Sequence, residues 1–371
     1  MRLGLIVNPV AGLGGRVGLK GTDGPEVVRR ARRLGAVPEA PGRAQRALNA
    51  LSPLRDQLLV LTYPGEMGEK MAQACGFRVE LVGRLRGEES TAEDTQDAAQ
   101  ELLRRGVDLL LFCGGDGTAR DIYAAVGTEL VVVGIPAGVK MHSAVFAPTP
   151  ERAGEVARRY LEGEIRAVVE AEVMDIDEKA FRRGEVHARL FGYLKAPRVR
   201  GGLQGAKVAT PPSERYVQQA IAARVVEDMK PGVLYLIGPG TTTKAVLEAL
   251  GLTGTLLGVD AIRDGKLQGA DLSEGEILSF LNEGPAKAVV SPIGGQGHIL
   301  GRGNQQLSPR VIRAAGGKRA LVVLATPEKL ATLRGRPLMV DTGDPALDEE
   351  LSGYIAVITG YRERVIYRVT H

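Results

Sequence analysis

The stretch "LLLFCGGDGTARDI", residues 109–122, decides the fold of this chain. Its first five residues are apolar without alternation, which is typical of a parallel strand covered on both faces. Glycines and a single carboxylate, Asp116, follow directly, and then a helical pattern begins. A buried strand that runs through a glycine-rich turn into a helix indicates an α/β protein, in which ligands bind beyond the carboxyl ends of the strands.

The N-terminal part of the chain repeats this pattern. We expect helices over 90–106 and 149–163. The first has Ser90 and Glu93 at capping-box spacing, and the second has Thr149 before Pro150. Short apolar runs predict buried strands at 2–7, 57–62, 78–83, 107–113 and 129–135. Strands that alternate with helices predict a doubly wound parallel sheet.

The pattern changes near residue 165. A long antiparallel hairpin is expected over 165–194, followed by a helix over 216–229. From residue 232 onward the α/β alternation returns, and a second hairpin is expected over 354–369. Strands are predicted here at 255–260, 286–291, 319–325 and 337–341. For 371 residues, at roughly 150 per domain, we expect two domains: an N-terminal α/β domain, 1–164, and a mixed α/β domain, 165–371.

Composition excludes several classes of protein. The net charge of +4, the 4% aromatic content and the absence of Trp do not favour a nucleic-acid reader built on stacking platforms. No apolar run approaches the roughly 20 residues of a membrane helix. Pro9 breaks the first apolar run too early for a signal peptide, and two cysteines do not make a disulfide framework. We therefore expect a cytoplasmic protein that binds small anions.

Four successive strands are followed by glycine-rich loops, at 8–24, 63–68, 114–118 and 136–143. Together they suggest one cleft with a floor of exposed backbone, where a helix N-terminus favours phosphate. Asp116 would repel a bare phosphate, so it suits binding a metal ion or accepting a proton from an attacking hydroxyl. The alternative is an Asp that only caps the following helix.

Common catalytic motifs are absent from the sequence. There is no G-x-x-x-x-G-K-[ST], no G-x-G-x-x-G after the first strand, no zinc-like Cys/His spacing and no G-x-S-x-G. A P-loop enzyme and a dinucleotide-dependent dehydrogenase are therefore disfavoured.

"GGDGT" directly after a buried strand resembles the signature of the superfamily that holds NAD kinases, diacylglycerol and sphingosine kinases and, more distantly, phosphofructokinases. "IVNPVAG", 6–12, resembles the opening shared by the lipid-kinase branch and the longer NAD kinases. "EAEVMDID", 170–177, and "VVSPIGGQGHILGRGNQQLSP", 289–309, are similar to nucleoside-contacting segments of NAD kinases. The motifs are scattered over residues 1 to about 310 and resemble most the long bacterial and archaeal ATP-NAD kinases.

The resemblance and the strand-end loops supply the candidate site residues. Asp116 is the candidate catalytic residue. The candidate cofactor-binding residues are Asn8, Gly12, Gly14, Gly15, Lys20, Gly114, Gly115, Gly117, Thr118, Lys140, His142 and Ser143. The candidate substrate-binding residues are Asp175, Ser291, Gly294, Gly295, Gln296 and His298. No metal ligand is assigned.

Two departures from the family concern the acceptor. Met174 stands where an Asn is expected, and Gly295–His298 stands where Ser-Thr-Ala-Tyr is expected. The segment 238–244 has no counterpart in ordinary NAD kinases. It is either a second phosphate site or a plain strand-to-helix turn. Lys20, Lys140, His142 and His298 each allow a plain loop or turn role as well.

The resemblance implies a kinase that transfers the γ-phosphoryl group of ATP, or of polyphosphate, to the 2′-hydroxyl of NAD, with Mg²⁺. It also implies a homo-oligomer with small-molecule substrates and neither nucleic acid nor membrane as a partner. Two alternatives stay open: a kinase of the same superfamily that acts on a lipid or another alcohol, and a non-catalytic nucleotide sensor.

Overall fold

The computed structural model describes residues 1–19, 24–87, 89–138, 141–176, 188–199, 212–293, 295 and 297–371. The described residues fall into two compact units. The first comprises Met1–Leu13, Gly21–Arg32 and Val37–Ala206, and the second Gly14–Lys20, Arg33–Ala36 and Lys207–His371. The expected boundary between an N-terminal domain, 1–164, and a second domain, 165–371, stays a prediction.

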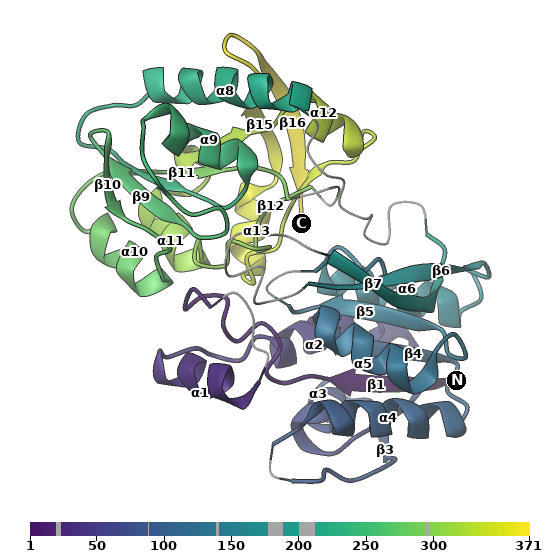
Figure 1. The fold of residues 1–371 in the computed structure, drawn as a ribbon. Helices are drawn as coiled ribbons and strands as arrows, with labels where there is room; N and C mark the ends of the chain where they lie inside the picture. The colour runs from purple at the N-terminus through teal and green to yellow at the C-terminus, as the bar shows by residue number, and fades with distance from the viewer. Residues whose placement is uncertain are drawn as a thin grey trace. The chain divides into compact units, whose positions relative to one another are not determined.

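The first unit is built on a five-stranded sheet in the order β3-β2-β1-β4-β5 (Figure 1). All four pairings between neighbouring strands are parallel. The strands are β1 (Arg2–Val7), β2 (Leu59–Thr62), β3 (Arg78–Leu81), β4 (Leu109–Gly114) and β5 (Val132–Pro136). The helices are α1 (Pro25–Arg33), α2 (Ala40–Asn49), α3 (Glu69–Ala74), α4 (Ala92–Arg104), α5 (Asp116–Val126) and α6 (Pro150–Leu161).

The two faces of this sheet are covered by different helices, which explains why the central strands are apolar throughout. Leu109, Leu111 and Cys113 of β4 pack in one core with α2, α3 and α6. Leu110 and Phe112 pack in the other core with α4 and α5. Alternate residues of one strand thus enter opposite cores, as a doubly wound sheet requires. The predicted fold class is confirmed.

Helix α4 corrects one detail of the prediction. The capping box is formed by Thr91 and Asp94, not by Ser90 and Glu93. Thr91 Oγ1 accepts from the Asp94 N–H at 3.2 Å, and the Thr91 N–H donates to Asp94 Oδ2 at 2.9 Å. Asp serves at the third helical position as Glu would, and sequence spacing does not separate two candidate caps that are one residue apart. The Thr149 cap and Pro150 at the start of α6 are confirmed.

Strands β6 (Val168–Ile176) and β7 (Ala188–Pro197) form the expected antiparallel hairpin. They make a separate two-stranded sheet that belongs to the first unit. Strand β6 packs on α5, and β7 packs on β5 and α5. The ribbon therefore lies beside β5, the edge strand of the five-stranded sheet. The backbone of β6 therefore runs close to the loop that follows β5.

The second unit contains a mixed sheet of nine strands in the order β10-β9-β8-β11-β13-β15-β16-β14-β12. The strands are β8 (Leu234–Ile237), β9 (Asp260–Arg263), β10 (Lys266–Gly269), β11 (Ala286–Val290), β12 (His298–Leu300), β13 (Leu321–Leu324), β14 (Leu338–Val340), β15 (Gly353–Ile358) and β16 (Arg364–Thr370). The helices are α8 (Pro212–Glu227), α9 (Thr241–Ala249), α10 (Glu274–Leu281), α11 (Pro309–Ala315), α12 (Pro327–Thr332) and α13 (Pro345–Leu351). Strands β8, β11, β13 and β15 are parallel neighbours, and β15–β16 is the expected terminal hairpin.

The strand predicted at 255–260 is wrong. This segment is irregular, and β9 begins only at Asp260. The Asp260 carboxylate accepts from the Thr255 N–H at 2.7 Å and from Thr255 Oγ1 at 2.9 Å. A local side-chain bond of this kind closes the segment into a loop and competes with strand pairing. Among the described helices, none combines the length and the apolar composition that crossing a membrane requires.

A substitution at Gly154 tests the close contact between α2 and α6. A Cβ atom there would lie 2.0 Å from the Ala47 carbonyl oxygen, so Gly154→Ala must push the two helices apart. We expect a loss of about 1–3 kcal/mol in the free energy of unfolding, measured as a lower midpoint in urea. Gly42→Ala is the matched control, because nothing lies within 4 Å of its Cβ position. In α2, Gly42→Ala lowers the backbone entropy of the unfolded chain, so it stabilises the folded protein by about 0.5–1 kcal/mol. Equal midpoints for the two variants would contradict the close packing.

Candidate functional site

The carboxyl ends of β1 and β4 lie at the switch point where this sheet reverses its strand order. The chain builds outward from β1 to β2 and β3, then returns to place β4 on the other side of β1. Open α/β sheets bind ligands at such a switch point. Asn8 follows β1 and lies across it: Asn8 Nδ2 donates to Thr118 Oγ1 at 3.0 Å, and the Asn8 N–H donates to the Cys113 carbonyl at 2.9 Å.

The glycines of the predicted floor bring three loops into backbone contact. A Cβ at Gly114 would lie 2.4 Å from Thr118 Oγ1. Gly12 has φ +75°, and a Cβ there would lie 2.1 Å from the Ala137 carbonyl oxygen. A Cβ at Gly115 would lie 3.2 Å from the Gly138 Cα. Glycine is thus needed here for the loops after β1, β4 and β5 to meet.

Helix α5 begins at the switch point. Its N-cap is Gly115, which has no side chain to cap the helix, and Asp116 and Thr118 lie in the first turn. Both side chains are buried. The free N–H groups of such a turn and its partial positive charge favour an anion. Asp116 is therefore not a capping residue, and its carboxylate points to other partners.

The Asp116 carboxylate accepts hydrogen bonds from the loop after β5. Oδ1 accepts from the Ser143 N–H at 3.0 Å and from Ser143 Oγ at 2.6 Å. Oδ2 accepts from the His142 N–H at 2.7 Å and lies 3.3 Å from His142 Nδ1. A carboxylate offers about four lone-pair directions; three N–H and O–H donors of His142 and Ser143 bind this one, and the His142 ring nitrogen lies beside Oδ2. These donors of its own chain stabilise the carboxylate.

This arrangement does not fit a metal ion held by side chains. A magnesium ligand needs a free oxygen lone pair, and those of Asp116 are engaged. In the part of the chain that the structure describes, no three His, Cys, Asp or Glu side chains are grouped to hold a metal. Asp116 is therefore held by N–H and O–H donors of its own chain.

His142 has one ring nitrogen without a partner. The residue is 6% exposed, and its Nε2 atom is buried with no hydrogen bond to any described residue. A buried polar atom left in this state costs about 1–3 kcal/mol. The site thus contains a single imidazole whose inner nitrogen is fixed on Asp116 and whose outer nitrogen is unsatisfied.

Ser143 connects this loop to β6. Its hydroxyl has one proton and lies 2.6 Å from Asp116 Oδ1 and 2.9 Å from the Met174 carbonyl. The ionised carboxylate is the closer and stronger acceptor, so we assign the proton to that bond. The Met174 N–H then donates to Ser143 Oγ at 3.0 Å. Met174 therefore contributes its backbone at the position where family resemblance expects an Asn side chain.

Several predicted residues belong to the second unit. Gly14 and Gly15 lie in the segment grouped with that unit, and a Cβ at Gly15 would meet the Gln305 side chain at 3.1 Å. His298 is fully buried at the start of β12. The Gly295 carbonyl accepts from Arg336 Nη2 at 2.8 Å. The structure describes these residues within their own unit.

Lys329, which the sequence did not single out, joins two strand-end loops of the second unit. Its Nζ donates to Ser291 Oγ at 3.1 Å and to Thr242 Oγ1 at 3.2 Å. Ser291 follows β11, and Thr242 lies in the first turn of α9 after Gly240. The signal available was "ATPEK", 325–329, a Thr cap and Pro directly after an apolar run. The loop 238–244 therefore faces a lysine, whichever of its two predicted roles holds.

Some predicted residues lie outside the described part. These are Lys20, Lys140, Gly294 and Gln296. For Asp175 the structure describes the backbone, which pairs with Arg189 in the hairpin. Gly117 lies in the first turn of α5, as expected.

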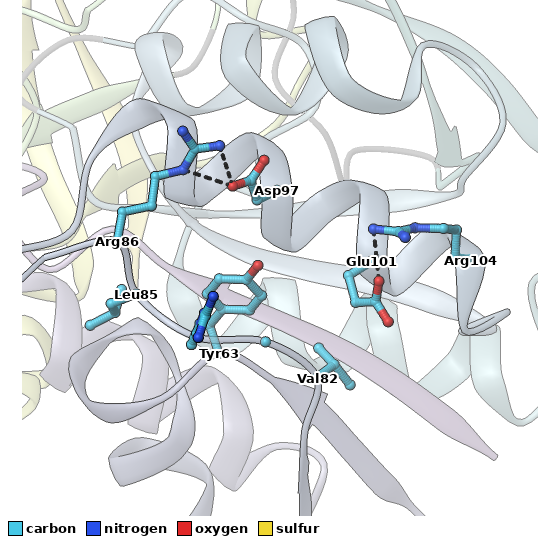
Figure 2. Close-up of a pocket in the computed structure, with 9 residues that line it drawn as sticks. Tyr63, Val82, Leu85, Arg86, Asp97, Glu101 and Arg104 are labelled. Atoms are coloured by element: carbon cyan, nitrogen blue, oxygen red, sulfur yellow. Dashed lines mark hydrogen bonds and ion pairs between the residues drawn. The ribbon is translucent and has the colours of Figure 1, made fainter.

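A cavity of about 770 Å³ lies at the carboxyl ends of β2 and β3 (Figure 2). Two ion pairs line it: Arg86 with Asp97 at 2.6 Å and Arg104 with Glu101 at 2.8 Å. Burial raises the pKa of the Tyr63 hydroxyl, and the nearby carboxylates, Asp97 foremost, raise it further. The Tyr63 hydroxyl therefore stays protonated well above neutral pH.

Comparisons with known families agree with this geometry. A family model described as the ATP-NAD kinase N-terminal domain matches residues 3–165, which include the switch point between β1 and β4. A second, the ATP-NAD kinase C-terminal domain, matches residues 231–369. A search of curated proteins finds no match. The two family models cover most of the chain, so this protein is a phosphotransferase that belongs to the ATP-NAD kinase family.

Proposed function

We propose that this enzyme transfers the γ-phosphoryl group of ATP to the 2′-hydroxyl of the NAD adenosine ribose, giving NADP and ADP. The observation that carries the proposal is the buried Asp116 carboxylate in the first turn of α5, at the switch point of a sheet matched by the ATP-NAD kinase family. Phosphoryl transfer needs a place for the phosphates and a group that handles the proton of the attacking hydroxyl.

The donor phosphates are proposed to bind at the N-terminus of α5 and along the loops after β1, β4 and β5. The free N–H groups of the helix start favour phosphate. The charge of Asp116 does not oppose this, because it is met by N–H and O–H donors of His142 and Ser143. Asn8, Gly12, Gly114, Gly115, Gly117 and Thr118, with Gly14, Gly15, Lys20 and Lys140, are the proposed contacts. Polyphosphate presents the same chemistry and is the alternative donor.

The acceptor is proposed to use the second part of the chain. The proposed contacts are Asp175, Ser291, Gly294, Gly295, Gln296 and His298, on the family resemblance of their segments. Residues 1–164 would then form the ATP-binding domain, and residues 165–371 would contribute NAD binding. On the same resemblance we propose a cytoplasmic homo-oligomer.

The reaction balances without another reactant. The 2′-oxygen forms a bond to the γ-phosphorus, the bond from that phosphorus to the β–γ bridging oxygen breaks, and ADP leaves with that oxygen. The hydroxyl proton passes to a base of the enzyme. Positioning of the two oxygens in line, together with electrostatic stabilisation of the phosphoryl group, supplies most of the acceleration in such reactions. Mg²⁺ enters the experiments as the ion bound to ATP.

The assay that tests this proposal measures NADP. Purified enzyme is incubated with NAD, Mg²⁺ and either ATP or polyphosphate, and NADP is read with an NADP-specific dehydrogenase. We expect NADP with at least one donor, in proportion to enzyme. If neither donor gives NADP, NAD is the wrong acceptor. Phosphorylation of a lipid or another alcohol would then point to the related kinases, and NAD binding without turnover of any donor would point to a sensor.

Asp116→Asn tests the site itself. The NH₂ group of the asparagine would face hydrogen-bond donors of His142 and Ser143, so those donors would lose an acceptor. The His142 ring would also lose the negative charge that lies beside Nδ1. We expect kcat to fall by roughly 10²-fold or more and unfolding stability to fall by about 1–3 kcal/mol. Asp121→Asn, the same change on the partly exposed side of α5, is the control and should retain activity. Full activity in Asp116→Asn would remove this carboxylate from the mechanism.

A further inference from the structure

The cavity at the ends of β2 and β3 is separate from the cluster around Asp116. Its walls come from Tyr63 after β2, the loop after β3 and one face of α4. Because β1 lies between β2 and β4, the ends of β2 and β4 are two strand spacings apart, about 10 Å. The volume of about 770 Å³ is within the range of roughly 300–1,000 Å³ that is typical of small-molecule pockets. The cavity is therefore large enough for a ligand of its own.

Tyr63 presents a hydroxyl to this cavity. The residue is 5% exposed, and its hydroxyl makes no hydrogen bond with any residue that the structure describes. Figure 2 shows the hydroxyl directed toward the face of α4 that carries Asp97 and Glu101. Burial, and then these carboxylates, raise the pKa of the hydroxyl, so it keeps its proton and is able to donate it. Since buried polar groups in native proteins are nearly always paired, this donor calls for an acceptor from a bound molecule.

Gly83 makes room for the Tyr63 ring. A Cβ atom at residue 83 would lie 2.3 Å from Tyr63 Cε2 and 2.6 Å from the hydroxyl oxygen. Gly83 is not among the described glycines with positive φ, so the ring, and not the backbone conformation, requires a glycine here. The loop after β3 is thus fitted closely around the phenol, which gives the hydroxyl a fixed position at the cavity.

The charges of the walls favour an anion. Arg86 holds the Asp97 carboxylate through Nε at 2.9 Å and Nη2 at 2.6 Å, and Arg104 lies 2.8 Å from Glu101. Both carboxylates therefore already have a cationic partner. Arg84 also lines the cavity and makes no ion pair with any described residue. A guanidinium presents several N–H donors that match the oxygens of a phosphate group.

We propose that this cavity binds a small phosphate monoester, with the Tyr63 hydroxyl and the Arg84 guanidinium donating to the phosphate oxygens. A phosphate monoester has three terminal oxygens and up to two negative charges, whereas a carboxylate offers two oxygens and one charge. The ion pairs of Arg86 with Asp97 and of Arg104 with Glu101 hold the surrounding side chains in place. The proposal does not rest on the proposed reaction, because it uses none of the residues proposed to contact ATP or NAD.

The test observes the Tyr63 hydroxyl directly. The full chain is labelled with tyrosine carrying ¹³C at Cζ, and the Tyr63 signal is assigned by its loss in Tyr63→Phe. That variant keeps the ring and removes a hydroxyl that has no partner among the described residues, so we expect it to fold. Inorganic phosphate, AMP and acetate are titrated at constant ionic strength. Phosphate and AMP are expected to move the Tyr63 signal to saturation, with AMP binding at least as tightly, and acetate to leave it unmoved.

Arg84→Gln tests the charge in the same titration. Loss of a hydrogen bond to a charged group is expected to weaken phosphate and AMP binding, read at the Tyr63 signal, by about tenfold or more. Arg78→Gln is the matched control, because Arg78 is an exposed arginine on β3 that does not line the cavity. It removes the same charge and should change the affinity by less than about threefold.

Each other outcome would overturn the proposal. A Tyr63 signal that moves with neither phosphate nor AMP would mean that the cavity does not bind phosphate groups. A signal that moves with phosphate alone would exclude a monoester, and one that moves equally with acetate would remove the preference for phosphate. Equal losses of affinity in Arg84→Gln and Arg78→Gln would reduce the effect to general attraction of anions. Because the titrations require no NADP formation, failure of the proposed function is seen separately.

Discussion

The central constraint in the first unit is one buried negative charge. Asp116 sits in the first turn of α5, where the helix dipole favours a carboxylate, but its oxygens do not cap the helix. They bind the backbone N–H groups of His142 and Ser143 and thereby hold the loop after β5 over the start of α5. If one partner of these buried, charge-assisted hydrogen bonds is removed, the others are left unpaired. The free-energy cost of those unpaired groups exceeds the net stabilisation that the hydrogen bonds provide.

The surrounding glycines follow from the same requirement. The loop after β5 can reach Asp116 only if it approaches the chain after β1 and the chain after β4 at backbone distance, which Gly12 and Gly115 permit. Ser143 then extends the network to the Met174 N–H of the β6–β7 ribbon. The strand ends, the ribbon and the helix start are thus linked through a single carboxylate and hydroxyl, and small changes at this point affect all three.

Much of the fold was predictable because it depends on local pattern. The apolar runs of β1, β4 and β5, both faces of which are buried, identify the parallel sheet, and Thr149 with Pro150 identifies α6. The irregular segment 255–260 was not predictable, because an apolar run does not reveal that Thr255 bonds Asp260. Similarly, the glycines and Asp116 indicated a site, whereas the partners of Asp116 lie 26 and 27 residues away in sequence. Lys329 was missed for the same reason, since its contacts with Ser291 and Thr242 join three separate strand ends.

The role of Asp116 in holding the loop after β5 is seen most directly in which nitrogen of His142 carries the proton. A two-bond ¹H–¹⁵N correlation spectrum of the ¹⁵N-histidine-labelled free enzyme at neutral pH reports this tautomer. With Asp116 ionised and facing Nδ1, the spectrum should show His142 protonated at Nδ1 and unprotonated at Nε2. A neutral His142 protonated at Nε2 would contradict this role of Asp116, because the carboxylate would then not orient the ring.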